Sequence, residues 1–328
     1  MKRVKIIGTG SYVPEKVLTN FDLEKMVDTS DEWIHTRTGM SERRIASDKD
    51  KASDLAVKAA HRALKDGGVT PEEIDLILVA TATPDMFFPS TACFVQSAIG
   101  AKKSAAFDIS AACSGYIYAL SVAEQYIKSG KYKTILLIAT EIFSRYIDWT
   151  DRNTCVLFGD GAAATVLKGV GGNKADGIIS TLIYSDGKYA DLLYLMGGGS
   201  SSPLTHETID NKLHLLKMKG NSLFKIAVKN MIKAAREALT LNGYKVSDID
   251  LLIPHQANKR IIDAVAESLN LPKEKVFVNI EKYGNTSAVS IPLALDEALK
   301  EGRIKEGDLI LMVAFGGGLT WGSALIRW

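Results

Sequence analysis

Cysteine is scarce in this chain of 328 residues, which contains Cys93, Cys113 and Cys155 and no other. An odd number of cysteines without CxxC spacing argues against a disulfide framework and against a zinc site. We therefore expect no bound metal, and we expect any functional cysteine to act as a thiol.

An excess of one charge and long apolar runs are also missing. Lys and Arg number 40 against 38 Asp and Glu, so the net charge of +2 gives no argument for binding nucleic acid or an anionic membrane. The apolar run at residues 135–139 is far too short to span a bilayer, and the start of the chain lacks the apolar core of a signal peptide. We expect a soluble, cytoplasmic protein.

An internal repeat organises what is present. The segment ALKDGGVTPEEIDLILVATA, from Ala63, has a counterpart 175 residues later, and the segment from Phe107 has one 171 residues later. Each unit combines a helix with a continuous apolar strand, a pattern typical of sheets covered by helices on both faces. We predict an α/β fold of two duplicated halves, residues 1–171 and 172–328, joined in the glycine-rich stretch 169–177.

Cys113 follows a short apolar strand and precedes a predicted helix with apolar residues at helical spacing. At a helix N-terminus the dipole and the free backbone N–H groups favour the thiolate, which is the reactive form of cysteine. The alternative, a buried cysteine that only fills space, is the interpretation we adopt for Cys93 and Cys155.

Two further polar residues and a run of glycines fall at the ends of predicted strands. His255 ends the apolar strand in DLLIPHQAN, where α/β folds usually bind ligands. The offset of 171 maps Cys113 onto Gly284, next to Asn285, so the repeat predicts that Cys113, His255 and Asn285 meet between the halves. Taken singly, His255 could be satisfied by backbone and Asn285 could be a helix cap. Residues 316–318 are glycines, which would allow close approach of a ligand or form a tight turn.

Basic residues recur on one face of a predicted helix at residues 224–239. They fit either a solvated face of an amphipathic helix or a docking surface for an acidic partner.

The motifs AACSG around Cys113, PHQAN around His255 and YGNTSAVS around Asn285 together resemble the Cys–His–Asn set of the β-ketoacyl-acyl carrier protein synthase III family. These condensing enzymes initiate bacterial-type fatty acid synthesis. The resemblance covers the whole chain and includes GTGSYVPEKVLTN, DEWIHTRTGM, TDRNTCVLFGDGA, MKGNSLFK and AFGGGLTWGSALIRW. It implies a thiolase-like five-layer α/β/α/β/α fold, a homodimer and no permanently bound cofactor.

The resemblance also implies a reaction. Cys113 would take an acetyl or short acyl group from acyl-coenzyme A and condense it with malonyl-acyl carrier protein, releasing CO2 and giving acetoacetyl-acyl carrier protein. His255 and Asn285 would hydrogen-bond the malonyl thioester oxygen. The oxyanion on the acyl-Cys113 carbonyl would meet the backbone N–H groups of Cys113 and Gly317.

Other residues take roles by the same resemblance. Phe88 would reach across the dimer to cap the acyl pocket. The residues implied in binding coenzyme A and substrate are Trp33, Arg37, Arg152, Gly220, Asn221, Phe224, Asn258 and Phe315. Those implied in docking acyl carrier protein are Lys225, Gln256, Ala257, Asn258, Lys259 and Arg260.

Several related activities fit less well. Thiolases use a second cysteine in the C-terminal half, which has none here, and elongating synthases have a second histidine where Asn285 stands. Plant-type polyketide synthases share Cys–His–Asn, but HQANKR and DEWIHTRTG favour an initiating synthase. The alternatives that remain are a starter synthase of secondary metabolism and a catalytically silent paralogue that acts as a binding subunit.

Overall fold

The computed structural model describes residues 3–171 and 176–328. Two sheets organise the chain, and each is made of strands from one half of the sequence. The first sheet has the order β1-β7-β6-β4-β5 and the second β11-β12-β13-β8. The strands of the first are β1 (Arg3–Tyr12), β4 (Leu76–Ala80), β5 (Ala105–Ile109), β6 (Thr134–Glu141) and β7 (Gly161–Val170). The strands of the second are β8 (Gly177–Ser185), β11 (Leu251–Pro254), β12 (Leu309–Gly316) and β13 (Thr320–Arg327).

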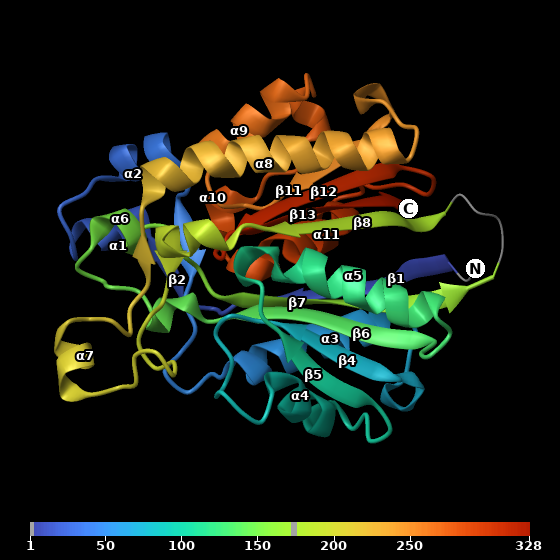
Figure 1. The fold of residues 1–328 in the computed structure, drawn as a ribbon, viewed down its shortest axis with the longest axis horizontal. Coiled ribbons are helices and arrows are strands. Elements are labelled where there is room, and N and C mark those ends of the chain that lie inside the picture. Colours follow the sequence, from blue (N-terminus) through green and yellow to red (C-terminus); the bar gives the residue numbers. More distant parts are fainter. Residues whose placement is uncertain (1–2, 172–175) are drawn as a thin grey trace.

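Helices form three layers around these sheets (Figure 1). Helices α5 (Gly115–Lys128) and α11 (Ser290–Lys300) lie between the sheets, and their apolar side chains share one core with both. Helices α3 (Ala52–Asp66) and α4 (Thr91–Ile99) cover the outer face of the first sheet. Helices α8 (Gly220–Leu241) and α9 (Lys259–Ser268) cover the outer face of the second. The predicted five-layer α/β/α/β/α fold is confirmed.

Shorter elements connect and border these layers. The two small ribbons pair β2 (Val17–Thr19) with β3 (Glu42–Arg44) and β9 (Leu193–Tyr194) with β10 (Lys217–Met218). The short helices are α1 (Asn20–Glu24), α2 (Asp31–Thr38), α6 (Arg152–Cys155), α7 (His206–Asp210) and α10 (Ile280–Tyr283). Single 3₁₀ turns, η2 (Ala112–Ser114) and η7 (Ser287–Val289), precede α5 and α11.

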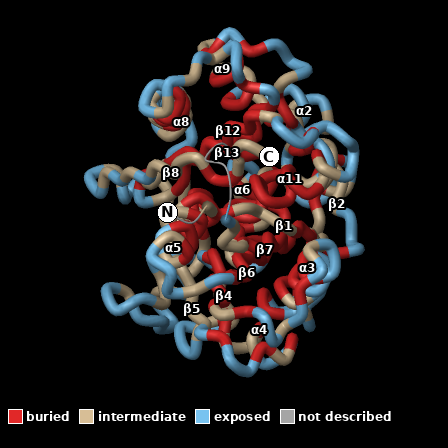
Figure 2. Tube along the Cα trace, turned by 90° about the vertical axis from the view of Figure 1, so that its right-hand side faces the viewer, coloured by how far each residue is buried: buried red, intermediate tan, exposed pale blue. Residues whose placement is uncertain are grey.

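The apolar strand runs are continuous because the central strands are covered on both faces. In β4, Leu76, Leu78 and Ala80 face the core between the sheets, while Ile77 and Val79 face α3 and α4. The buried residues accordingly fill the interior, and the exposed ones lie on the outer helices and loops (Figure 2).

The two sheets repeat one topology. In each, two antiparallel contacts join three strands, β1-β7-β6 in the first sheet and β8-β13-β12 in the second. A parallel contact then follows, to β4 in the first sheet and to β11 in the second. The boundary predicted between residues 171 and 172 adjoins residues 172–175, which lie outside the described residues, and it stays a prediction.

The repeat aligns the two halves differently from the sequence prediction. The turns before α5 and α11 are related by the offset of 175, since Ala112 and Ser287 both have a positive φ, +46° and +52°. Cys113 therefore corresponds to Ala288, and the predicted match to Gly284 is wrong. The segment after Val278 forms helix α10, where the first half has strand β5, and this difference shifts the register before the turn.

No helix within residues 3–171 and 176–328 is both long and apolar enough to cross a membrane. In the same residues, no group of three His, Cys, Asp or Glu side chains is placed to hold a metal ion.

Candidate active site

Cys113, His255 and Asn285 line one cavity of about 810 Å³, as the repeat and the resemblance predict. Thirteen of the residues selected from the sequence line it: Trp33, Arg37, Cys113, Gly220, Asn221, Phe224, Lys225, His255, Ala257, Asn258, Arg260, Asn285 and Phe315. They come from both halves of the chain. The structure thus brings the candidate nucleophile together with the two candidate hydrogen-bond donors.

Cys113 lies in the turn η2, directly before α5, and only 5% of its surface is exposed. Burial raises the pKa of its thiol to about 12, and a weaker opposing effect comes from the hydrogen bond that Ser287 makes to it. Loss of water favours the neutral thiol, whereas a helix N-terminus favours the thiolate, and the expected effect of the helix stays a prediction. A thiol that attacks a carbonyl carbon must give up its proton.

His255 follows β11 and is 2% exposed. Its Nδ1 lies 2.6 Å from Ser290 Oγ, which also accepts a hydrogen bond from the Gln256 backbone N–H at 3.3 Å. The Ser290 hydroxyl can therefore give its own proton to Nδ1, which leaves the ring proton on Nε2. Burial lowers the pKa of His255 to about 3, so the ring is neutral near pH 7 and can donate one hydrogen bond from Nε2.

Asn285 is held by its backbone and by one side-chain oxygen. Its N–H donates to Leu157 O at 2.8 Å, its carbonyl accepts from the Gly159 N–H at 3.1 Å, and its Oδ1 accepts from the Ser287 N–H at 2.8 Å. Because Oδ1 is used in this way, the amide NH2 is the group that can donate to a substrate.

Gly316 and Gly317 bring the end of β12 against the Cys113 turn. A Cβ on Gly316 would lie 2.7 Å from the Cys113 backbone nitrogen, and one on Gly317 would lie 3.0 Å from Leu193 O. Only glycine allows this approach at position 316. The oxyanion-binding role of the Cys113 and Gly317 N–H groups stays a prediction.

Two guanidinium groups flank an indole at the cavity mouth. Arg152 lies 4.9 Å from the Trp33 ring centroid and Arg37 lies 5.8 Å from it. Trp33 and Arg37 line the cavity. Arg152 does not line it, but its guanidinium lies over the Trp33 ring and donates to Asp28 O at 2.7 Å. A flat ring beside two guanidinium groups can stack a purine and bind phosphate.

Helices α8 and α9 form the wall between the mouth and Cys113. Asn258 caps α9 by accepting from the Arg260 N–H at 2.9 Å, and it ties α2 to this wall by donating to Arg37 O at 3.1 Å. Arg260 lies over the Phe224 ring at 5.4 Å, and Lys225 lines the cavity beside it. Basic side chains thus border the entrance.

Five residues chosen from the sequence do not line the cavity: Arg152 and Gly317, described above, and Gln256, Lys259 and Phe88. Gln256 is 1% exposed, its amide donates to Pro254 O and its Oε1 accepts from the Asn279 N–H, so the predicted contact of Gln256 with acyl carrier protein is wrong. Lys259 forms an ion pair with Asp263 along α9. Phe88 is 84% exposed and does not line the cavity of its own chain.

Three residues next to the site were not singled out from the sequence: Ser287, Ser290 and Glu141. The two serines belong to the TSAVS stretch, where they suggest only a helix start. Glu141 ends the apolar run of β6, and a polar residue at the end of a buried strand is the same signal that selected His255.

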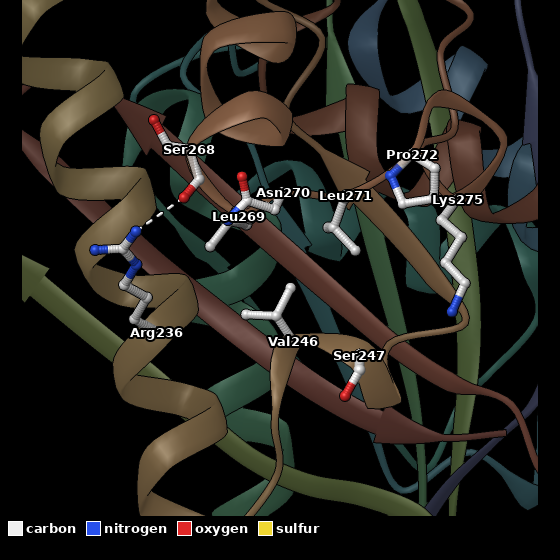
Figure 3. A pocket seen from close by; sticks show the side chains of 9 residues that line it. All are labelled: Arg236, Val246, Ser247, Ser268, Leu269, Asn270, Leu271, Pro272 and Lys275. Carbon is white, nitrogen blue, oxygen red and sulfur yellow. Dashed lines mark hydrogen bonds between the residues drawn. The ribbon is translucent and has the colours of Figure 1, made fainter.

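A second hollow, of about 500 Å³, lies between the C-terminal ends of α8 and α9 (Figure 3). Arg236 and Lys275 border it, and Arg236 donates to Ser268 O at 2.8 Å. None of its nine lining residues, all in the described part of the chain, is a cysteine, a histidine or a carboxylate. Its lining therefore lacks the thiol and the imidazole that the cavity at Cys113 provides.

Comparison with known proteins decides the family. The model of 3-oxoacyl-[acyl-carrier-protein] synthase III matches residues 107–187, and the model of that protein's C-terminal part matches residues 239–328. The β-ketoacyl-[acyl-carrier-protein] synthase III of Caldanaerobacter subterraneus subsp. tengcongensis is 55% identical over 98% of this chain and 97% of its own. The chain belongs to the β-ketoacyl-acyl carrier protein synthase III family. It is accordingly a condensing acyltransferase that initiates fatty acid synthesis.

Solved structures agree with this assignment. The crystal structure of 3-oxoacyl-[acyl-carrier-protein] synthase III from Aquifex aeolicus is 56% identical, with a TM-score of 0.92 over 99% of this chain and all of that one. The priming β-ketosynthase of the R1128 polyketide pathway is 36% identical, with a TM-score of 0.91 over 99% of this chain and 96% of that one. The fold is therefore shared with a starter synthase of secondary metabolism.

Proposed function

We propose that this protein transfers an acetyl or short acyl group from acyl-coenzyme A to Cys113 and condenses it with malonyl-acyl carrier protein. The products are acetoacetyl-acyl carrier protein, CO2 and coenzyme A. One observation supports this most directly: a thiol, a neutral imidazole and an amide NH2 border a single cavity whose mouth has an indole between two guanidinium groups.

Acyl transfer comes first in this scheme. The coenzyme A adenine stacks at Trp33, with its phosphates near Arg37 and Arg152, and the pantetheine runs past Gly220, Asn221, Phe224 and Asn258 to Phe315. Cys113 Sγ attacks the thioester carbonyl, and the developing oxyanion accepts from the N–H groups of Cys113 and Gly317. Because one thioester replaces another, the acyl group stays activated.

Decarboxylation and condensation follow. His255 Nε2–H and the Asn285 NH2 both donate to the thioester oxygen of the malonyl group, which becomes an enolate oxygen as CO2 leaves. A neutral histidine suits this role, since it offers one directed donor and no mobile charge. The carbanion then attacks the acyl-Cys113 carbonyl, and Cys113 leaves as thiolate.

Acyl carrier protein is the proposed macromolecular partner. Lys225 and Arg260 line the cavity, next to Ala257, Asn258 and Lys259, so basic side chains border the opening that the pantetheine must enter. Acidic partners are steered to such surfaces by their charge. We propose no resident cofactor, with coenzyme A thioesters as substrates, and we place the protein in the cytoplasm, where these thioesters are made.

A homodimer is the proposed assembly. Strand β5 forms an edge of the first sheet, and Phe87 and Phe88 before α4 are 82% and 84% exposed. An unpaired strand edge beside large exposed apolar side chains is typical of a surface that a second copy covers. In such a dimer Phe88 would cap the partner's acyl pocket.

The similarity to the R1128 priming ketosynthase favours, as second candidate, a starter synthase of secondary metabolism. The higher identity to fatty acid enzymes supports the first. A silent paralogue is disfavoured because Cys113, His255 and Asn285 are all present at one cavity.

The test is a complete turnover. Purified protein is incubated with acetyl-coenzyme A and malonyl-acyl carrier protein, and the carrier protein is weighed by mass spectrometry. We expect acetoacetyl-acyl carrier protein with the native chain and none with Cys113→Ser. If a malonyl group on another carrier, but not on fatty acid acyl carrier protein, is condensed, the second candidate is correct.

A further inference from the structure

A carboxyl group lies buried beneath Cys113, and the reaction described above leaves it without a role. Glu141 ends β6 and has no exposed surface. It accepts hydrogen bonds from Thr83 Oγ1 at 2.7 Å and from the Ala82 N–H at 3.2 Å. Burying a carboxyl group is costly even when it is hydrogen-bonded, so its position calls for an explanation.

A single hydroxyl joins this carboxyl to the nucleophile. Ser287 Oγ lies 3.4 Å from Cys113 Sγ and 3.2 Å from Glu141 Oε1. A hydroxyl has one proton, so it donates to only one of these neighbours at a time and accepts from the other. Two proton arrangements fit the same heavy atoms: thiol to serine to carboxylate, or carboxylic acid to serine to thiolate.

The backbone at Ser287 is strained in a way that supports this link. Its φ of +52° lies in the left-handed region, which costs a residue with a side chain roughly 1 kcal/mol or more. Strain of this kind is typical of functional sites. Here it belongs to the turn that places Ser287, from the C-terminal half, between two groups of the N-terminal half.

We propose that Ser287 and Glu141 form a proton relay for Cys113, which takes up the thiol proton during acylation and returns it during condensation. This inference rests on the proposed function. Ser287 touches the reacting sulfur, whereas Glu141 acts through Ser287 and is a positioning residue for the proton.

The protons balance over both half-reactions. As Cys113 Sγ bonds to the acyl carbon, its proton passes to Ser287 Oγ, and the Ser287 proton passes to Glu141. The bond to the coenzyme A sulfur breaks, and that thiolate leaves and takes a proton from water. In condensation the new C–C bond forms and the Cys113 C–S bond breaks. The Glu141 proton then returns through Ser287 to the expelled thiolate.

The electrostatics suit a group that both accepts and returns a proton. Burial raises the pKa of Glu141 to about 7, while the hydrogen bonds from Thr83, Ala82 and Ser287 oppose that rise. The titratable neighbours that interact with Glu141 are Cys113, which is buried, and Tyr146, which is partly buried, and loss of water raises the pKa of both. Glu141 thus has the lowest pKa of the three, so it is the group that is ionised above about pH 7 and can accept the proton as Cys113 bonds to the acyl carbon, and the proton returns readily to the more basic Cys113 thiolate.

The test compares Glu141→Gln and Ser287→Ala with Glu124→Gln. Glu124 is a matched control, because it is a buried glutamate (1% exposed) on α5, hydrogen-bonded to Thr181 and Lys128, away from the cavity. Two rates of Cys113 modification are followed from pH 6 to pH 9: first-turnover acetylation by acetyl-coenzyme A and alkylation by iodoacetamide. Circular dichroism checks that each variant is folded. If Glu141→Gln does not fold, Ser287→Ala still tests the relay, because it leaves the contacts of Glu141 with Thr83 and Ala82 in place.

The relay predicts a change in the shape of the pH profile. In the native protein and in Glu124→Gln, both rates should level off once Glu141 is ionised. In Glu141→Gln and Ser287→Ala, acetylation at pH 7 should fall by about 100-fold, the usual contribution of a general base, and both rates should keep rising with pH. An unchanged rate, or a fall that is equal at every pH, would show that Glu141 is only structural and would overturn the relay. If the native protein is alkylated but never acetylated, the proposed function fails, and the alkylation profile still tests the relay.

Discussion

Burial sets the protonation state of each reactive group in this site. It raises the pKa of Cys113 to about 12, lowers that of His255 to about 3 and raises that of Glu141 to about 7. Before substrate enters, the nucleophile and the imidazole are therefore both neutral near pH 7. His255 and Asn285 are equipped to stabilise a developing oxyanion, and neither is equipped to remove the thiol proton.

We expect His255→Ala and Asn285→Ala to separate the two half-reactions. Each removes one donor to the malonyl thioester oxygen, so decarboxylation should slow by about 10²- to 10³-fold. Acylation of Cys113 should continue, because neither side chain is needed for that step. Release of CO2 from malonyl-acyl carrier protein and the mass of the acyl-enzyme measure the two steps. Condensation at the native rate in either variant would contradict these roles.

His255 should also make the fold sensitive to acid. The unfolded chain binds this proton near pH 6.5, whereas the folded chain does not bind it until about pH 3. The unfolding free energy therefore decreases as pH falls through this window, because the unfolded state holds more protons. In His255→Asn the decrease between pH 6.5 and pH 4.5, followed by urea unfolding, should be smaller than in the native protein. An equal decrease would show that His255 is not buried in its neutral form.

The sequence indicated the candidate reactive residues, but it did not indicate the residues that contact and position them. That Cys113, His255 and Asn285 meet at one cavity could be predicted, because strand ends and family motifs mark them. Ser287 could not, because its role depends on contacts 174 positions away at Cys113 and 146 away at Glu141. Sequence position also failed for Gln256, which directly follows His255 but turns its amide into the interior.

At the scale of elements, the close approach of β12 to the turn before α5 holds the nucleophile in place. Gly316 is the residue that permits it, since a side chain would meet the Cys113 and Ser114 nitrogens at 2.7 and 3.0 Å. The repeat predicted such paired strand–turn–helix units, but it placed Asn285 opposite Cys113. Helix α10 could not be predicted from the spacing of apolar residues, because the corresponding short segment of the first half forms strand β5.

Gly316→Ala should displace the Cys113 turn. We expect a loss of about 1–3 kcal/mol in unfolding free energy, the usual cost of forcing an extra group into a packed site, together with slower acylation. Gly187→Ala is the matched control, because its added Cβ would meet nothing within 4 Å. Thermal unfolding and acyl-enzyme formation measure both effects. Equal behaviour of the two variants would contradict the close packing.

Helices α8 and α9 should contribute the docking surface. Arg260→Glu reverses a charge at the entrance and should raise the apparent KM for malonyl-acyl carrier protein several-fold at low salt, with little change for acetyl-coenzyme A. Lys65→Glu makes the same charge change on α3, which covers the outer face of the first sheet. Steady-state kinetics with each substrate varied in turn measures the difference. Equal effects on both substrates would remove the docking role.

At the scale of the whole molecule, two similar halves create one site that neither contains alone. Cys113 and Glu141 belong to the first sheet's half, and His255, Asn285 and Ser287 to the second. The layered fold could be predicted because buried strands alternate with helices throughout. A homodimer, in which Phe88 would meet the second copy, could be inferred from the sequence only through the family resemblance.

Assembly of two copies should be visible in solution. We expect sedimentation of the native protein to give twice the mass of one chain. Phe88→Ser should alter which acyl groups are accepted by Cys113, because the residue would cap the partner's pocket. A native monomer, with acyl selectivity unchanged in Phe88→Ser, would contradict both the dimer and the cap.

Every later step of the proposed reaction depends on an acyl group held by Cys113 as a thioester. The most direct measurement is intact-protein mass spectrometry after incubation with a panel of acyl-coenzyme A thioesters, with Cys113→Ser as control. We predict a mass increase of one acyl group in the native chain, greatest for acetyl or another short acyl group, and no increase in the variant. A native chain that gains no acyl group from any thioester, or a Cys113→Ser variant that gains one, would contradict thioester formation on Cys113.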